Sequence, residues 1–280
     1  NNTIPSPTVT WATSSSSVAT VSSTGLVTAI ADGSATITAT SGSVNQTAAV
    51  TVSQAAASVT LAPTSLSFAS VDDTTTLVPT VKDANNNAIG GATVTWATSS
   101  SSVATVSSAG LVTAIANGTA TITAISGSAS ATATTTVSQV ASSITLAPTS
   151  LSFASVDDTT TLVPTVKDAN NNTIPSPTVT WATSSSSIAT VSSAGLVTAV
   201  ADGSATITAT SGSVNATATA TVSQVVSSVG LSAASVSLTS PGDTAQLTAT
   251  VRDANDNTIG GATVTWATSN SSFATVSSAG

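Results

Sequence analysis

The chain has 280 residues and a formal net charge of −8, and it contains no Cys, His or Met. With only 5% charged residues and three basic side chains, it has no basic patch for nucleic acid. No apolar run approaches the roughly 18–20 residues of a membrane-spanning helix. Without Cys, the fold must be held by core packing rather than by disulfides.

The four tryptophans show that the chain is a tandem array. They are Trp11, Trp96, Trp181 and Trp266, each 85 residues after the one before, and each lies in Thr-Val-Thr-Trp-Ala-Thr-Ser. A fixed long period of this kind marks repeated structural modules. We expect a partial repeat at residues 1–54, complete repeats at 55–139 and 140–224, and a partial repeat at 225–280. Both ends fall inside a repeat, which predicts a window on a longer chain.

Two types of repeat alternate along the array. Ile4-Pro5-Ser6-Pro7 matches Ile174-Pro175-Ser176-Pro177, whereas Ile89-Gly90-Gly91-Ala92 matches Ile259-Gly260-Gly261-Ala262. Elsewhere the copies are close, because the segments 61–87 and 146–172 are identical.

The second repeat shows the period-2 alternation of short β-strands throughout, and no helical period. In chain order, the expected strands are 58–61, 65–69, 76–82, 93–97, 103–106, 111–115, 119–124 and an Ala/Thr-rich strand ending at Val137. Turn residues separate them, as in the Asp-Ala-Asn-Asn-Asn segment at 83–87. Alternation with β-branched residues predicts sheets with one buried face and one solvent-exposed face. The sequence therefore predicts an all-β chain of antiparallel β-sandwiches.

The aromatic residues are the expected core of each sandwich. The candidate core residues are Trp11, Trp96, Trp181, Trp266, Phe68 and Phe153, and Phe273 also fits this pattern. If Trp96 is buried, Trp96→Ala should cost about 3–5 kcal/mol. The segments that join the repeats, at 52–58, 137–143 and 222–228, are short and not Gly-rich, which predicts a stiff, elongated rod.

The run from Val94 to Ala124 recurs in every repeat as far as the chain extends, and it resembles the bacterial immunoglobulin-like group 2 family. Lys82–Asn87 together with Gly91–Trp96 also resembles the group 1 modules of invasin and intimin. The resemblance implies an immunoglobulin-like fold and occurrence in surface adhesins, stalks, enzyme appendages and phage virion proteins. It implies no catalytic residue.

Three loops place oxygen-bearing side chains at alternate positions, as calcium loops do. The candidate ligands are Asp83, Asn85, Asn87, Asp168, Asn170, Asn172, Asp253, Asn255 and Asn257. The helix-flanked loop with a distal Glu is missing, so a hairpin turn is the favoured interpretation and calcium the alternative. The pairs Asp72-Asp73 and Asp157-Asp158 lie near the end of a repeat and could join such a loop in holding calcium between domains, although a solvated loop is favoured. No cofactor is otherwise expected.

Other reactive sites are weakly indicated. The abundant Ser and Thr residues have no His or Cys to activate them, so the segment is predicted not to be an enzyme. An isopeptide crosslink at Lys82 or Lys167 is disfavoured because Arg252 occupies the matching position. Asn45, Asn117 and Asn215 begin glycosylation sequons, which arise readily in such a composition. Runs such as Thr119–Thr123 could form a flat ice-binding surface, but outward-facing strand positions explain them more simply.

The absence of a reactive site favours a structural function for the array. We expect an extracellular, non-enzymatic shaft of a bacterial surface protein, or a filament that self-assembles through uncharged strand edges. An adhesin that binds host protein or glycan through domain-end loops is one alternative, and a phage decoration or tail-fibre module is another. The expected partners are copies of the chain or cell-surface components, without nucleic acid or membrane insertion.

Overall fold

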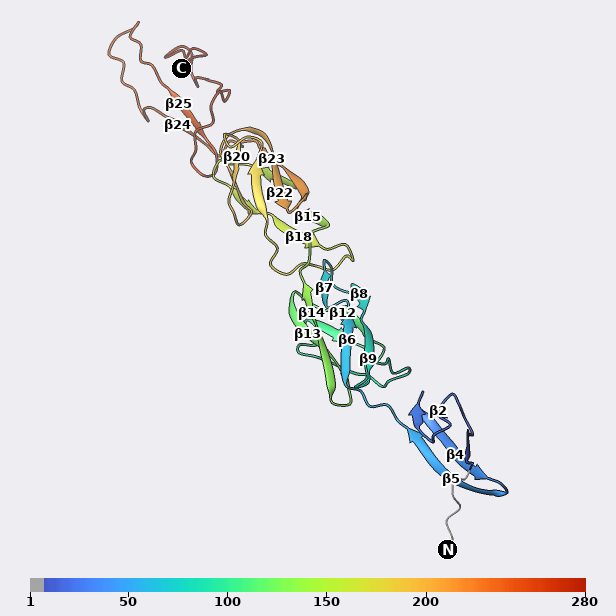
Figure 1. The fold of residues 1–280 in the computed structure, drawn as a ribbon. Coiled ribbons are helices and arrows are strands. Elements are labelled where there is room, and N and C mark those ends of the chain that lie inside the picture. The colour runs from blue at the N-terminus through green and yellow to red at the C-terminus, as the bar shows by residue number, and fades with distance from the viewer. Residues whose placement is uncertain (1–7) are drawn as a thin grey trace. The chain divides into compact units, whose positions relative to one another are not determined.

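The computed structural model describes residues 8–280, and within this range every regular element is a β-strand. The expected all-β class is confirmed. The Ile-Pro-Ser-Pro segment at 4–7, on which the repeat alternation partly rests, lies outside the described residues. The chain divides into two compact units, Asn1–Ser138 and Gln139–Gly280 (Figure 1).

The second repeat contains nine strands in three small sheets. They are β6 (Ser58–Ala62), β7 (Ser65–Phe68), β8 (Thr74–Thr76), β9 (Val78–Lys82), β10 (Thr95–Thr98), β11 (Ala104–Val106), β12 (Leu111–Ala114), β13 (Gly118–Ser126) and β14 (Ala129–Val137). One sheet has the order β10-β13-β14-β7. The other layer consists of the sheet β11-β12-β8 and the pair β6-β9.

The third repeat has the same arrangement. Its strands are β15 (Ser143–Ala147), β16 (Ser150–Phe153), β17 (Thr159–Thr161), β18 (Val163–Lys167), β19 (Thr180–Thr183), β20 (Ala189–Val191), β21 (Leu196–Ala199), β22 (Gly203–Ser211) and β23 (Val214–Val222). The corresponding sheets are β16-β23-β22-β19, β17-β21-β20 and β15-β18.

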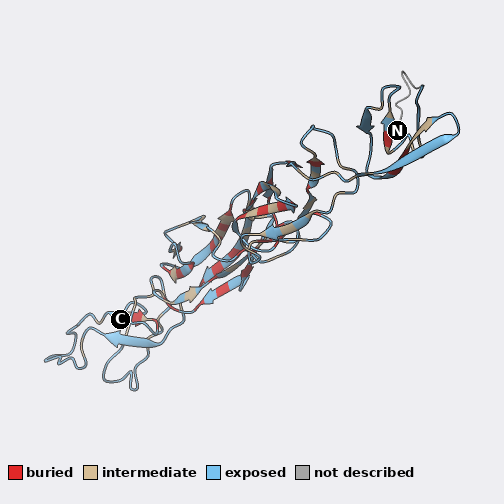
Figure 2. Cartoon of the chain, turned by 60° about the horizontal axis from the view of Figure 1, so that its bottom comes forward, coloured by how far each residue is buried: buried red, intermediate tan, exposed pale blue. Residues whose placement is uncertain are grey.

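The first and last repeats contain only part of this set. The first has β1 (Thr10–Thr13), β2 (Ala19–Val21), β3 (Val27–Ala29), β4 (Gly33–Ser41) and β5 (Val44–Val52), and the last has β24 (Ser228–Leu231) and β25 (Ala249–Arg252). Buried residues concentrate in the strands of the two complete repeats, whereas most of 232–280 is exposed (Figure 2).

The core of each complete repeat follows from strict alternation along its strands. In β13, Ala120, Ile122 and Ala124 are buried while the threonines between them face outward. Because many inward residues are as small as Ala, the two layers can pack closely around a few larger side chains. Leu77 and Phe68 are among these larger residues, with 0% and 5% of their surface exposed.

Two details of the strands differ from the sequence expectation. The segment 76–82, expected as one strand, is divided at Leu77, so that β8 pairs with β12 and β9 pairs with β6 in a different sheet. Leu77 is fully buried at this crossing, and its N–H donates to the Gly110 carbonyl at 2.9 Å. The pairing is also not wholly antiparallel, because β7 runs parallel to β14.

The tryptophans lie at the edge of the core rather than inside it. Trp96 and Trp181 are half-buried and pack against the buried clusters of their repeats, and Trp11 is 37% exposed. The indole ring of Trp96 lies directly against Gly110, where a Cβ atom, if present, would be only 2.8 Å from Cζ2 of the ring. The indole ring therefore covers a glycine backbone instead of filling the interior.

Phe273 is 89% exposed, in contrast to the expected core position. Its counterpart in the second repeat, Val103, faces Gly118 at the start of β13, where an added Cβ would lie 2.9 Å from Val103 Cγ2. The sequence ends at Gly280, before the segment that corresponds to β13 and β14.

Candidate inter-repeat joint

The turn Asp83–Asn87, here called the Asp loop, is organised by the carboxylate of its first residue. Oδ1 of Asp83 accepts hydrogen bonds from the N–H groups of Asn85 and Asn87 at 3.0 and 2.8 Å. The Asp83 N–H donates to the Asn87 carbonyl at 2.9 Å, and Asn86 adopts a left-handed φ of 69°. Asn tolerates this backbone conformation better than most residues. The sequence thus folds locally into a tight turn whose centre is a carboxylate.

The same loop recurs in the next two repeats. Oδ1 of Asp168 accepts from Asn170 and Asn172, and Oδ1 of Asp253 accepts from Asn255 and Asn257, all through backbone N–H groups at 2.8 to 3.1 Å. The structure therefore brings each trio of predicted calcium ligands together, but through hydrogen bonds to backbone and side-chain amides.

A glutamine from the segment that enters each repeat binds the second carboxylate oxygen. The Nε2 groups of Gln54, Gln139 and Gln224 donate to Oδ2 of Asp83, Asp168 and Asp253 at 3.0, 2.8 and 2.9 Å. These glutamines were missed by sequence reasoning. Their spacing of 29 residues before each Asp was the available signal, since it repeats with the 85-residue period.

The third and fourth repeats are joined through this loop. The N–H of Val156, in the loop between β16 and β17, donates to Oδ2 of Asp253 at 3.0 Å. In return, Nδ2 of Asn255 donates to the Val156 carbonyl at 2.8 Å and to Oδ1 of Asp158 at 3.0 Å. Nδ2 of Asn257 donates to Oδ2 of Asp157 at 3.2 Å. The predicted carboxylate pair 157–158 thus meets the predicted ligand loop.

Two further hydrogen bonds tie the connecting chain to the third repeat. The Gln224 N–H donates to Oδ1 of Asp202 at 2.7 Å, and the Val225 N–H donates to the Ala154 carbonyl at 2.8 Å. The first of these has a counterpart where the first repeat ends, because the Gln54 N–H donates to Oδ1 of Asp32 at 2.6 Å. The connecting segments are therefore anchored rather than free.

The hydrogen bonds shift the titration of the loop carboxylates. The side-chain hydrogen bond from Gln54 is the largest influence on Asp83, and with the Asn87 and Asn85 donors it lowers the pKa of Asp83 below its ordinary value. Burial raises the pKa of Asp253, but the donors on Gln224, Asn257, Val156 and Asn255 outweigh burial, so its pKa is also lowered. Asp253 is 2% exposed. The hydrogen-bond donors at the joint therefore stabilise the ionised form of the Asp253 carboxylate.

Metal binding would have to compete with these hydrogen bonds. Across residues 8–280, no three Asp side chains lie close enough to form a metal-ligating group by themselves. Both oxygens of Asp253 accept hydrogen bonds, and the Asn255 and Asn257 amides present their nitrogens to the neighbouring loop. An amide nitrogen does not ligate calcium. To bind the ion, both side-chain amides would have to rotate so that their oxygens replace their nitrogens.

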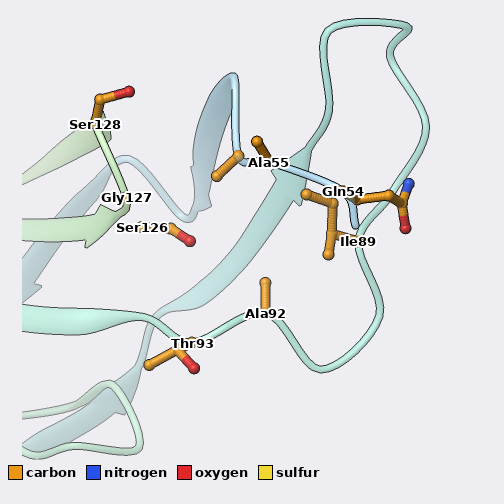
Figure 3. Close-up of a pocket in the computed structure, with 9 residues that line it drawn as sticks. Gln54, Ala55, Ile89, Ala92, Thr93, Ser126, Gly127 and Ser128 are labelled. Carbon is orange, nitrogen blue, oxygen red and sulfur yellow. The ribbon is translucent and has the colours of Figure 1, made fainter. Parts of the chain in front are cut away.

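Each complete repeat also has an open hollow beside the glutamine. In the second repeat it measures about 350 Å³ and is lined by Gln54, Ala55, Ala56, Ile89, Ala92, Thr93, Ser126, Gly127 and Ser128 (Figure 3). A similar hollow of about 290 Å³ follows in the third repeat, where Pro177 replaces Ala92. The segment in which the two types of repeat differ, Gly-Gly-Ala in one and Pro-Ser-Pro in the other, therefore contributes its last residue to the lining of the hollow. No ionisable side chain lines either hollow, so neither has the groups for acid–base chemistry.

Two of the three basic residues, Lys167 and Arg252, interact with residues of their own turns. Lys167 Nζ donates to Oδ1 of Asn171 at 3.1 Å, and Arg252 Nε lies 3.6 Å from Asp256 Oδ1. In each case the two residues are four positions apart, so the interaction links no separate strands. Among the described residues, no helix is long and apolar enough to cross a membrane.

Comparison with known proteins places the repeats in a family. The model of the bacterial Ig-like domain (group 2) matches residues 2–52, 55–137 and 140–222. Ice-binding protein 1 of Shewanella frigidimarina is 35% identical over 123 residues, which cover 43% of this chain and 14% of that protein.

The solved structures that the chain matches include an S-layer protein and invasin. The S-layer protein SbsC is 23% identical with a TM-score of 0.31, and the match covers 90% of this chain and 39% of that one. Invasin, described as a bacterial integrin-binding protein, is 20% identical with a TM-score of 0.39, covering 73% of this chain and 48% of that one. The chain thus spans less than half the length of each of these relatives.

Proposed function

The chain belongs to the bacterial Ig-like domain (group 2) family, and we propose that it is a non-enzymatic structural segment of a bacterial surface protein. In this role the repeats supply length and hold other parts of the protein away from the cell. The partners are then the neighbouring segments of the same protein and cell-surface components.

The observation that carries this proposal is the joint between the third and fourth repeats. A spacer needs connections that resist bending, and here Asp253, Asn255 and Asn257 make hydrogen bonds to three consecutive residues of the preceding repeat, Val156–Asp158. Short connecting segments with anchored backbone, as at Gln224 and Val225, add to this restraint.

The distribution of charge also supports a passive role. The Asp side chains lie in loops and turns of the described chain, whereas the strands contain no carboxylate. The faces of the sandwiches are therefore nearly neutral, and the loop carboxylates that could do chemistry are occupied by hydrogen bonds. The family relationship fits an exported bacterial protein.

Surface labelling of intact cells tests the proposal. An antibody raised against the second and third repeats should label unbroken cells of the organism that encodes the chain, and external protease should remove the signal. Deleting residues 55–224, one pair of alternating repeats, should leave the rest of the protein at the surface but shorten its reach. Labelling that appears only after lysis would contradict the proposal.

A second candidate function is contact with ice through the outer face of the four-stranded sheet. Thr119, Thr121 and Thr123 of β13 lie directly opposite Thr136, Thr134 and Thr132 of β14, so threonines form paired rows on that face. The third repeat has the same face, with Thr206 opposite Thr219 and Thr208 opposite Thr217. The relative from S. frigidimarina is named for binding ice, and this chain matches 14% of it.

Inhibition of ice recrystallisation distinguishes this candidate from a plain spacer. If the face binds ice, Thr121→Lys with Thr206→Lys should abolish inhibition by the purified chain. Thr113→Lys with Thr198→Lys, on β12 and β21 of the other layer, should leave it intact. A wild-type chain that does not inhibit recrystallisation rules the candidate out.

A further inference from the structure

The hollow beside the glutamine contains a hydroxyl group that the fold itself does not use. Ser126 in the second repeat and Ser211 in the third are the last residues of β13 and β22, and they are only 6% and 5% exposed. Neither hydroxyl makes a hydrogen bond to another residue of the described chain. Because buried hydroxyls are normally paired, two unpaired ones at the same position of both complete repeats need an explanation.

Both hydroxyls belong to the lining of the hollow in their own repeat. Figure 3 shows the Ser126 hydroxyl pointing into this space. The unpaired hydroxyl of Thr135 differs, because its oxygen is closed off from solvent. A molecule in the hollow can therefore use the Ser126 hydroxyl as a hydrogen-bond donor or acceptor.

The rest of the lining fits a neutral ligand with many hydroxyl groups. Thr93 and Ser128 add two further hydroxyls, and Ala56, Ile89 and Ala92 add small apolar surfaces. A sugar ring is complementary to this combination, since it carries hydroxyls at its edge and C–H groups on its faces. No ionisable side chain lines the hollow, so a charged ligand would find no partner for its charge.

The size of the hollow restricts the ligand to a short one. Its volume of about 350 Å³ lies near the lower limit of ligand pockets, which measure roughly 300–1,000 Å³. The hollow therefore has room for a short saccharide, and its open side leaves space for the rest of a longer glycan chain.

The segment that distinguishes the two types of repeat forms one wall of this hollow. Ala92 stands there in the second repeat and Pro177 in the third, where the volume is about 290 Å³. The residue before each of them has a left-handed backbone, with a φ of 70° at Gly91 and 51° at Ser176. The backbone is thus kept while the side chains of the wall change. A spacer gives no reason for this alternation, whereas a difference in ligand preference does.

We propose that the hollow of each complete repeat binds a neutral saccharide, with Ser126 or Ser211 as its buried hydrogen-bonding group and Ala92 or Pro177 selecting the sugar. An open hollow binds a single sugar weakly, and repetition along the array compensates only when the sugars are fixed on one surface. This assigns the ligand to the ends of neutral glycan chains. The inference goes beyond the proposed structural role and does not depend on it.

Saturation-transfer NMR on the 280-residue chain tests the site. The probes are the neutral disaccharides lactose, maltose, cellobiose and diacetylchitobiose at millimolar concentration, with glucuronic acid as a charged probe. We expect transfer of magnetisation from the chain to at least one of the neutral disaccharides and none to glucuronic acid. A chain that transfers to no neutral disaccharide, or equally well to glucuronic acid, would overturn the proposal.

Removing the buried hydroxyls locates the binding site. Ser126→Ala with Ser211→Ala should weaken binding of the sugar about tenfold, the effect of one lost hydrogen bond. The matched control, Ser108→Ala with Ser193→Ala, removes exposed serines that line neither hollow and should leave binding unchanged. Thermal melting checks that both variants are folded. Equal affinities for the two variants would place the sugar elsewhere and overturn the site.

An exchange of the wall tests selectivity and also covers a serine variant that does not fold. Gly90→Pro, Gly91→Ser and Ala92→Pro together give the second repeat the wall of the third. In NMR titrations, the amide signals of Gly127 and Gly212 report on the two hollows separately. After the exchange, Gly127 should respond to the same sugars as Gly212. A Gly127 response that the exchange leaves unchanged would overturn the wall as the selective element.

Beads coated with the sugar that binds distinguish a fixed glycan from a free sugar. Retention of the chain on these beads, lost in the paired serine variant, supports a glycan ligand. Binding of the free sugar without retention on the beads would assign the hollow to free sugars and overturn the glycan. All of these results concern the purified chain, so their outcome is independent of the labelling of intact cells that tests the proposed function.

Discussion

At the scale of single residues, comparing the same position in different repeats shows which side chains the fold requires and which it tolerates. Thr135 is fully buried, and its hydroxyl has no hydrogen-bond partner among the described residues. The corresponding positions in the first and third repeats are Val50 and Ala220. The fold therefore accepts an apolar side chain here, and the hydroxyl of Thr135 is a local cost to the second repeat.

We predict that Thr135→Val stabilises the second repeat. The change keeps the shape of the side chain and removes an unsatisfied buried group, which should raise the free energy of unfolding by about 1–2 kcal/mol. Calorimetry of the chain measures this as a higher melting temperature. Thr136→Val, at an exposed neighbour, serves as the control and should change little. A lower melting temperature for Thr135→Val would mean that the hydroxyl has a partner.

Gly110 shows the opposite situation, a position that no other residue can fill. Its φ is +80°, and an added Cβ would lie 2.6 Å from the Leu77 carbonyl oxygen and 2.8 Å from Trp96 Cζ2. The same glycine precedes the same Leu in each repeat, at Gly25 and Gly195. The tryptophan period that reveals the array thus depends on a glycine that supports each ring.

Gly110→Ala should destabilise the second repeat by about 3 kcal/mol, because it combines left-handed strain with a steric overlap. Gly127→Ala isolates the strain, since Gly127 has a φ of +58° but an added Cβ would meet no atom closer than Ala56 Cβ, at 3.9 Å. That control should cost about 1 kcal/mol. Denaturant unfolding compares the two, and equal losses would show that Trp96 does not rest on Gly110.

At the scale of strands and loops, the alternation of apolar and polar residues was enough to predict most strands and the all-β class. It could not predict the division at Leu77, because a strand that changes sheets keeps the same alternation. It also could not distinguish a core Trp from one at the edge, since both alternate in the same way. The Asp loops were located correctly as turns, but their glutamine partners lie 29 residues away and needed three-dimensional structure.

The Asp loops should make the joint sensitive to acid. Because the pKa of Asp253 in the folded chain is lowered, its contribution to stability is present above the ordinary Asp pKa of about 3.9 and is lost as the pH falls through the lower folded value. NMR titration of the Asp253 carboxyl should give a pKa below the ordinary value in the wild type. Gln224→Leu should raise that pKa, since it removes one of the donors. An unchanged pKa in the variant would contradict the role of Gln224.

At the scale of the whole molecule, the sequence predicted the array and its family, and the family model confirms both. The carboxylates and amides expected as calcium ligands meet at the joint, but their hydrogen bonds satisfy one another. We therefore predict that calcium does not stabilise the chain. Melting with millimolar calcium and with excess chelator should coincide, and a higher melting temperature in calcium would show that the amides reorient around an ion.

We propose that the repeats act as a spacer, and that the joint between the third and fourth repeats fixes one repeat on the next. Electron microscopy of the purified chain, beside chains with one and two added copies of residues 55–224, tests it most directly. We expect thin, separate particles whose length rises by the same amount with each added pair, with and without chelator. Compact particles, or lengths that scatter widely within one sample because the joints bend freely, would contradict it.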